Sequence, residues 1–154
     1  MAIPDRDTPA PSTVNMAAFS RLNEWAGEML SVLRIMSGLL FLQHGTQKFL
    51  YFPMGERAGS GWALASAGDF AGIIELIAGL LITLGLFTRP AAFVASGTMA
   101  AAYFIAHAPR GFFPIGNEGD AAVLYAFVFL YLVFAGPGPW SLDAVLRKDT
   151  RSVD

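Results

Sequence analysis

Two ionisable side chains lie within long apolar stretches of the sequence, where a chemical role is the default explanation. Glu75 lies in the apolar run DFAGIIELIAGLLITLGLF, residues 69–87, and His44 lies near the end of the preceding run. A carboxylate inside a bilayer raises the insertion free energy by about 2–3 kcal/mol, so it predicts a functional site with a polar partner. We expect His44 to be that partner and treat both as candidate catalytic residues. The alternative is a structural pair that fixes helix register.

Further polar side chains fall at similar depths on the other apolar stretches. Counting 1.5 Å of rise per residue, Glu75 lies roughly 9 Å below the outer edge of its span. Tyr103 and Tyr125 fall near that level, and His107 lies in the last outer turn of its segment. Arg34 lies lower, roughly 20 Å from the outer edge. These depths predict an outer polar layer around Glu75 and an inner one around Arg34, and they make the four further side chains candidate binding residues.

Each of these four side chains also has a purely structural interpretation. Tyr103 and Tyr125 can pack as aromatic filler with their hydroxyl groups hydrogen-bonded. Arg34 can serve as a buried structural cation or extend toward the inner interface. His107 lies close enough to the outer interface to be solvated or to cap a helix. Residue type and depth alone leave both interpretations open.

Composition sets the class of protein and excludes several kinds of site. The chain has 154 residues, of which 55% are hydrophobic and 14% charged, far from the roughly 25% charged residues of soluble domains. This composition indicates a membrane protein. A net charge of -2 with scattered Lys and Arg gives no basic stripe for nucleic acid. The absence of Cys excludes a disulfide, a thiolate metal site and a CxxC redox pair, and the two His residues lack metal-ligand spacing.

Four apolar segments of near bilayer-spanning length must position these side chains. They cover about 25–47, 69–87, 91–108 and 120–135. Backbone polar groups in a bilayer must be satisfied within the segment, so helices are expected. The sequence therefore predicts an all-α integral membrane protein, a four-transmembrane-helix bundle over residues 24–140. A polar N-terminal tail, 1–23, and a C-terminal tail, 141–154, flank this domain.

The distribution of basic residues predicts the orientation in the membrane. One group lies on the side of both termini: Arg6, Arg21, Arg89, Arg147, Lys148 and Arg151. A smaller group lies on the opposite side: Lys48, Arg57 and Arg110. The positive-inside rule places both termini in the cytoplasm.

Small and polar residues recur at helical spacing on the first two spans. The stripes are Ala71, Glu75, Gly79 and Thr83, and Arg34, Gly38, Phe41, Gly45 and Lys48. Small residues let helices approach closely in lipid, so we expect both stripes to face the bundle interior. The same feature permits a homo-oligomer.

Four blocks of the sequence together resemble the DoxX family of small four-helix bacterial membrane proteins. The blocks LRIMSGLLFLQHGTQKF, GDFAGIIELIAGLLITLGLFTRPAA, HAPRGFFPIGNEGDAAVLYAF and FAGPGPWSLD span about Leu33 to Asp143. The family pattern before the fourth span is Asn-Gly-Gly-Glu, whereas this chain has Asn117, Glu118, Gly119 and Asp120. The family is similar to the membrane subunit of thiosulfate:quinone oxidoreductases, and its relatives are associated with oxidative stress.

The resemblance implies a quinone-linked redox subunit of the bacterial inner membrane. It implies a site that comprises Arg34, His44, Lys48, Glu75, Asn117 and Asp120. In this hypothesis a quinone enters between the first and second spans, and Lys48 favours an anionic co-substrate. His44 hydrogen-bonds one carbonyl of the quinone, and Glu75 exchanges a proton with it. Flavin, haem and iron–sulfur motifs are absent from the sequence, so a soluble or membrane redox partner or a reducing substrate must supply electrons.

Two other classes of function remain open at this stage. One is a non-catalytic membrane subunit that docks a soluble redox partner, with the buried charges serving assembly. The other is a small transporter or proton-linked channel in which Arg34, His44 and Glu75 form a relay. The segment 46–68 is expected to be either a re-entrant piece or an ordinary surface loop.

Overall fold

The computed structural model describes residues 21–53 and 66–151, and every regular element in these two ranges is helical. The elements are α2 (Ala26–Leu50), α3 (Ala67–Leu84), α4 (Thr88–Ala102), the π-helix η2 (Tyr103–His107), the 3-10 helix η3 (Ala108–Arg110), α5 (Pro114–Asn117), α6 (Asp120–Ala135) and α7 (Leu142–Arg151). The all-α fold class is confirmed. Most of the predicted N-terminal tail and the middle of segment 46–68 lie outside the described residues.

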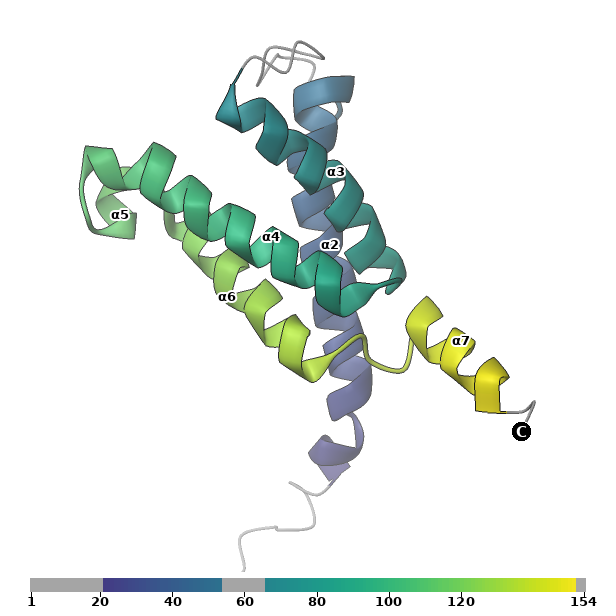
Figure 1. The fold of residues 1–154 in the computed structure, drawn as a ribbon. Coiled ribbons are helices and arrows are strands. Elements are labelled where there is room, and N and C mark those ends of the chain that lie inside the picture. The colour runs from purple at the N-terminus through teal and green to yellow at the C-terminus, as the bar shows by residue number, and fades with distance from the viewer. Residues whose placement is uncertain (1–20, 54–65, 152–154) are drawn as a thin grey trace, which may run out of the picture.

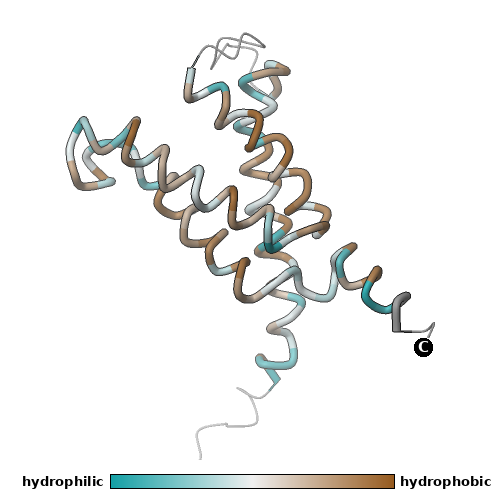
Figure 2. Tube along the Cα trace, in the orientation of Figure 1, coloured by the Kyte–Doolittle hydropathy of each residue, from teal (hydrophilic) through white to brown (hydrophobic). Residues whose placement is uncertain are grey.

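Three of the helical segments in the described ranges are long and apolar enough to cross a membrane: α2, α3 and the run Thr88–Arg110. The fourth apolar segment, α6, is shorter at 16 residues. Figure 2 shows apolar residues along the lengths of α3, α4 and α6 and hydrophilic ones at helix ends. The outward faces carry exposed large side chains such as Ile77, Phe93 and Phe127. Long apolar helices with exposed apolar outer faces are typical of a membrane protein.

Local sequence signals set the boundaries of α3 and α4. Ser66 and Asp69 form a capping box at the start of α3, each side chain accepting a backbone N–H of the other residue. Gly85 ends the helix in the left-handed conformation, with φ of 69°. α4 then begins after only a short turn. The tight turn places α3 and α4 antiparallel.

The helices form two pairs, α2 with α3 and α4 with α6, joined mainly through α3 and α4. Figure 1 shows the pairs diverging toward the end that holds α5. Glycines allow the closest approach within the first pair: a Cβ on Gly45 would lie 2.7 Å from Leu76, and one on Gly79 would lie 2.9 Å from Leu42. The α2–α3 contact is therefore packed backbone to backbone, as expected for small residues in lipid.

The buried core lies between the two pairs. Phe41, Ile82, Ala92, Phe129 and Leu132 have no solvent exposure. The Phe41 and Phe129 rings meet edge to face with centroids 4.8 Å apart. This core separates the diverging end of the pairs, where a cavity opens, from the end that carries α7.

Candidate functional site

A cavity of about 580 Å³ opens between the two helix pairs at their diverging end. Its lining is mostly apolar and comes from α2, α3, α4, η2 and α6. The polar and ionisable lining side chains are His44, Lys48, Glu75, Thr98, His107, Glu118 and Tyr125. An apolar hollow with a small number of convergent polar groups is the usual form of a small-molecule site.

The polar partner of Glu75 is Lys48. The Lys48 ammonium nitrogen on α2 lies 2.8 Å from each carboxylate oxygen of Glu75 on α3. The Lys48 side chain is 20% exposed and that of Glu75 6% exposed. The close approach of α2 and α3 at Gly45 brings the two helices near enough for this contact. The prediction that His44 pairs with Glu75 is wrong because the lysine one helical turn further along α2 takes that position.

His44 lies at an exposed edge of the cavity, on the side where α2 faces α6. Its ring meets the ring of Tyr125 edge on, with centroids 6.1 Å apart and an interplanar angle of 87°. Tyr125 in turn stacks on Phe129, with centroids 5.6 Å apart. The aromatic contacts hold the imidazole beside the cavity at a distance from the core.

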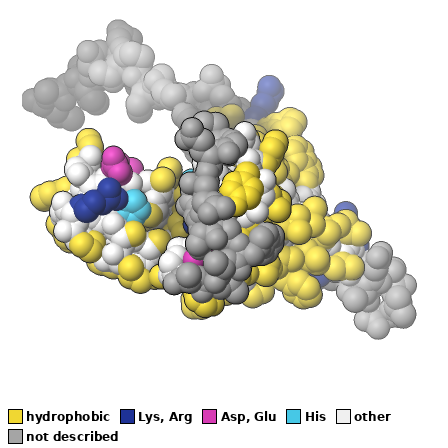
Figure 3. All heavy atoms as spheres, turned by 90° about the horizontal axis from the view of Figure 1, so that it is seen from above, with side chains coloured by type: hydrophobic (Ala, Val, Ile, Leu, Met, Phe, Trp, Pro, Cys, Tyr) yellow, Lys and Arg dark blue, Asp and Glu magenta, His cyan; other side chains and the backbone are white. Residues whose placement is uncertain are grey.

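The outer rim of the cavity is a polar network built on the π-helical turn at Tyr103–His107. His107 Nδ1 lies 3.1 Å from the carbonyl oxygen of Asn117 and 3.0 Å from a guanidinium nitrogen of Arg110. When protonated this nitrogen donates to the carbonyl, and when unprotonated it accepts from the arginine. Arg110 also pairs with Glu118 at 3.0 Å, and Figure 3 shows such a grouping of basic, acidic and His side chains on this end of the molecule.

Glu118 was missing from the residues predicted for the site. It lines the cavity and has a left-handed backbone conformation, with φ of 59°. The departure from the family pattern at this position was the only signal in the sequence that pointed to it. Its carboxylate is held on the rim by Arg110.

The structure does not bring Asn117, Tyr103 or Asp120 into the lining of the cavity. Asn117 is 1% exposed, and its side chain donates to Gly111 at 2.6 Å and accepts the N–H of Gly119 at 2.8 Å. The Tyr103 hydroxyl donates to the carbonyl of Phe112. Asp120 is exposed in the first turn of α6, where a carboxylate stabilises the helix N-terminus. Asn117 and Tyr103 thus fix the fold of the outer loop.

Arg34 also lies apart from the cavity, and its guanidinium binds backbone. It has no solvent exposure and donates to the carbonyls of Ile82 and Thr83, each at 2.6 Å, at the end of α3. It donates further to Pro137 at 2.7 Å and to Trp140, both in the segment after α6. The inner polar layer predicted around Arg34 is therefore a junction that joins both helix pairs. The segment GPGPW supplies two of its four acceptors.

The cavity reaches the outside between α3 and α4. Phe70 and Ile105 line it on that side and are 58% and 65% exposed. The contact between α2 and α3 is closed, because a Cβ on Gly72 would lie only 2.7 Å from the ring of Phe49. The access path expected between the first and second spans is thus blocked by helix packing. Within residues 21–53 and 66–151, no group of three His, Asp or Glu side chains is placed to hold a metal ion.

Comparison with known proteins identifies a family and two similar proteins. The DoxX family model matches residues 29–108, the part that holds His44, Lys48, Glu75 and His107. An uncharacterized protein of Haemophilus influenzae is 45% identical over 131 residues, which cover 80% of this chain and 95% of that protein. An uncharacterized membrane protein of Mycobacterium tuberculosis is 37% identical over 135 residues, 75% of this chain and 80% of that protein. No solved structure matches the chain.

Proposed function

Because the chain belongs to the DoxX family, we propose that it acts in the bacterial inner membrane as a quinone-linked redox subunit. The cavity between the helix pairs is the quinone site in this proposal. The observation that carries it is the partly buried Lys48–Glu75 ion pair at the polar end of an otherwise apolar cavity. The lateral opening between α3 and α4 admits a ligand that arrives from the lipid.

The residues of the cavity fit a quinone ring. Its volume of about 580 Å³ lies within the roughly 300–1,000 Å³ of ordinary ligand sites. Ile74, Met99 and Ala102 supply apolar walls for a flat ring, and the polar groups stand on the helices that flank them. A bound quinone supplies the capacity to take up two electrons and two protons.

Lys48 is the group we assign to a carbonyl oxygen of the ligand. An ammonium has three N–H donors, and the two carboxylate oxygens of Glu75 both accept from Lys48. The third donor is then the one assigned to the carbonyl oxygen of the ligand. The carboxylate compensates a lysine charge that burial would otherwise penalise. Glu75 therefore acts as a positioning residue: it keeps the ammonium group of Lys48 charged and holds it toward the cavity. This role differs from the proton exchange expected from the sequence.

His44 is the group we assign to proton delivery. A neutral imidazole carries one donor nitrogen and one acceptor nitrogen, so it can pass a proton across its ring. His44 stands at the exposed edge of the cavity, so its ring connects the interior with the outside. Tyr125 orients that ring through the edge-to-face contact.

Electrons come from a partner in this proposal, either a redox protein or a reducing co-substrate at the outer rim. With no Cys, the chain carries no thiol relay or thiolate-bound cluster of its own. Arg110, which belongs to the rim network, lies in the part of the molecule that such a partner would meet.

The proposed topology has α6 as the fourth span and both termini in the cytoplasm. At 1.5 Å per residue α6 is about 24 Å long, which spans a bilayer core that thins slightly around it. Because the chain has no native Cys, single substitutions Lys148→Cys and Arg110→Cys report on the two sides without background. An impermeant thiol reagent added to intact cells should label Arg110→Cys alone. Labelling of Lys148→Cys instead would reverse the orientation.

The function is tested by counting quinone in the organic extract of gently purified protein with mass spectrometry. The double variant Lys48→Met/Glu75→Leu removes the ion pair without leaving an unpaired buried charge. Asp120→Asn is the matched control, because Asp120 lies outside the cavity lining. We expect near-stoichiometric quinone in the wild type and the control, and its loss in the double variant.

Quinone in the wild type no higher than in the surrounding lipid would contradict this function and favour a subunit that only docks a redox partner. Flux of protons or small acids through proteoliposomes that contain the wild type, together with that result, would favour a transporter. The two measurements separate all three classes of function.

A further inference from the structure

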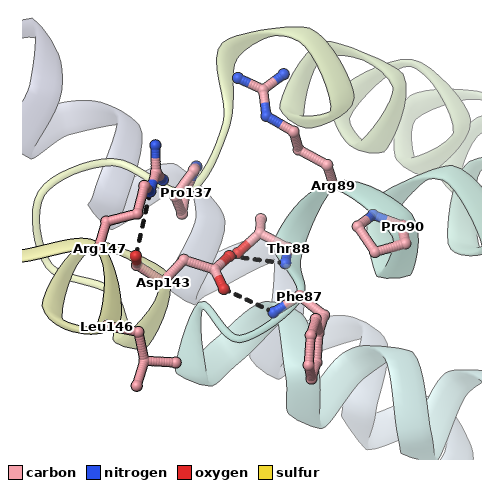
Figure 4. Close-up of a pocket in the computed structure, with 8 residues that line it drawn as sticks. All are labelled: Phe87, Thr88, Arg89, Pro90, Pro137, Asp143, Leu146 and Arg147. Atoms are coloured by element: carbon pink, nitrogen blue, oxygen red, sulfur yellow. Dashed lines mark hydrogen bonds between the residues drawn. The ribbon is translucent and has the colours of Figure 1, made fainter. Parts of the chain in front are cut away.

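A second hollow, of about 430 Å³, lies beside α7 at the end of the molecule away from the candidate quinone site. Its walls come from α7, the first turn of α4 with Phe87 before it, and the segment after α6. Figure 4 shows the side chains of Arg89 and Arg147 on opposite flanks, with Asp143 and Thr88 between them. The hollow thus presents two guanidinium groups to the same space.

The carboxylate in this hollow is already compensated by the fold. Asp143 accepts the backbone N–H of Phe87 at 2.9 Å and that of Thr88 at 2.9 Å. These are groups at the positive N-terminal end of α4. Arg147 adds its charge to this compensation. With Arg89 included, the lining of the hollow carries two arginines against one carboxylate, so its net charge is positive. A guanidinium offers five N–H donors in a fork that suits phosphate oxygens.

An apolar groove continues from the hollow along the contact between α3 and α4. Phe87 and Pro90 line both the hollow and the groove. The groove has a volume of about 320 Å³ and carries Ile77, Leu81 and Val94 on its walls. The order of surfaces, cationic at the end and apolar along the helices, matches the order of a phosphate and an acyl chain in a lipid.

α7 itself has the form of a helix that lies at a membrane surface. Leu142, Val145 and Leu146, at helical spacing, are 42%, 54% and 55% exposed. Trp140 just before the helix is 55% exposed, and Trp is enriched at the interface between headgroups and chains. An amphipathic helix with basic residues and an exposed apolar face lies in that interface.

We propose that this hollow binds an anionic phospholipid of the adjoining leaflet. Its phosphate lies between Arg89 and Arg147, and one acyl chain follows the groove between α3 and α4. The charges select an anionic headgroup, because juxtamembrane arginines attract negatively charged lipid. The groove shares the apolar residue Ile74 with the quinone cavity, but the two arginines that select the headgroup do not line that cavity. The charge selection can therefore be tested separately from the proposed function.

Native mass spectrometry of the detergent-purified full chain tests the site, with dioleoyl phosphatidylglycerol and dioleoyl phosphatidylcholine as the two probes. We expect the wild type to retain the anionic lipid in preference to the zwitterionic one. Arg147→Gln should weaken binding of the anionic lipid about fivefold, and Arg89→Gln/Arg147→Gln about 25-fold, from roughly fivefold for each charge. Arg110→Gln, an exposed arginine at the other end, is the matched control and should bind as the wild type does.

Arg147→Gln keeps the proposal falsifiable if the double variant fails to fold. Arg89 also donates to the carbonyls of Val133 and Phe134 at the end of α6, whereas Arg147 donates to the carbonyl of Asp143 within α7. Equal retention of both lipids by the wild type would overturn the proposal. An equal loss in Arg110→Gln would do the same, since it would indicate a general charge effect. Displacement of the lipid by equimolar glycerol 3-phosphate would overturn the assignment of the acyl chain.

Discussion

The ammonium nitrogen of Lys48 on α2 lies 2.8 Å from both carboxylate oxygens of Glu75 on α3, and the pair forms one wall of a cavity. An ion pair taken out of water is stable only while both partners are present. The two charges therefore act as a unit, in stability and in any ligand binding. This relationship makes a variant series on the pair the most direct probe of the site.

Single substitutions of the pair should destabilise the protein more than removal of both charges. Lys48→Met leaves the buried carboxylate of Glu75 without its partner, and we expect a loss of about 3–5 kcal/mol in the free energy of unfolding. Lys48→Met/Glu75→Leu replaces both charges by apolar groups and should recover most of that loss. Thermal or denaturant unfolding in detergent, arranged as a double-mutant cycle, measures the coupling. Additive effects of the two single variants would show that the pair is not coupled.

Arg34 should prove essential to folding and irrelevant to the ligand. Arg34→Lys keeps the charge but cannot reach four carbonyls at once, because an ammonium lacks the planar fork. We expect a loss of about 3 kcal/mol or more, since hydrogen bonds to charged groups contribute about 1.5–3 kcal/mol each. The measurements are the unfolding midpoint and the quinone content per folded chain. A normal midpoint with lost quinone would restore the binding role predicted from the sequence.

The contact between α2 and α3 should be intolerant of a single methyl group. Gly45→Ala places a Cβ 2.7 Å from Leu76, so the helices must separate, and we expect a loss of about 1–3 kcal/mol. Gly97→Ala is the matched control on α4, because a Cβ there meets no atom within 4 Å. That variant should be neutral or more stable, by up to about 1 kcal/mol, from helix propensity. Equal effects of the two substitutions on the unfolding midpoint would refute the close-packed contact.

The attachment of α7 should depend on pH. Partial burial alone would raise the pKa of Asp143, but the N–H groups of Thr88 and Phe87 and the charge of Arg147 hold that pKa below its usual value near 3.8. The carboxylate therefore stabilises the folded state fully above pH 3.8, and this contribution disappears as the pH falls through the lowered pKa.

Fluorescence of Trp140 can follow this transition when Trp25 and Trp62 are replaced by Phe. We expect the emission to change in acid in that background and to lose the pH dependence when Asp143→Asn is added. A transition of the same midpoint in the Asn variant would mean that another group controls the helix. The readout is local, since Trp140 lies just before α7.

The sequence predicted the helices and much of the lining because both depend on length and depth along an axis. His44, Glu75, His107 and Tyr125, which the sequence placed at similar depths, line the cavity, whereas Tyr103 at that level does not. Lys48, which the family resemblance implied, lines it as well. Depth does not give the rotation of each helix, which is why the partner of Glu75 was assigned one turn away from the true one.

The errors at Arg34 and Asn117 have a different physical origin. The guanidinium of Arg34 binds main-chain carbonyls, and the amide of Asn117 binds main-chain groups of its own loop. Backbone acceptors are present at every residue, so no pattern of side chains identifies which of them become partners. From the sequence alone, a polar side chain that hydrogen-bonds the backbone of a turn therefore looks the same as one that binds a ligand.

The junction at Arg34 fixes the two helix pairs to each other at one end of the bundle. It fastens α2 to the end of α3 and to the segment after α6, whereas the pairs part at the opposite end. Lys48 and Glu75 both lie on the α2–α3 pair. His107, in η2 after α4, and Tyr125, on α6, lie on the other side of the cavity. A small change in the angle between the two helix pairs would therefore change the width of the cavity. The distance between Lys48 and Glu75 would change little, because both lie on the same pair. The separation of the helix pairs can thus vary while the contact between Lys48 and Glu75 is kept.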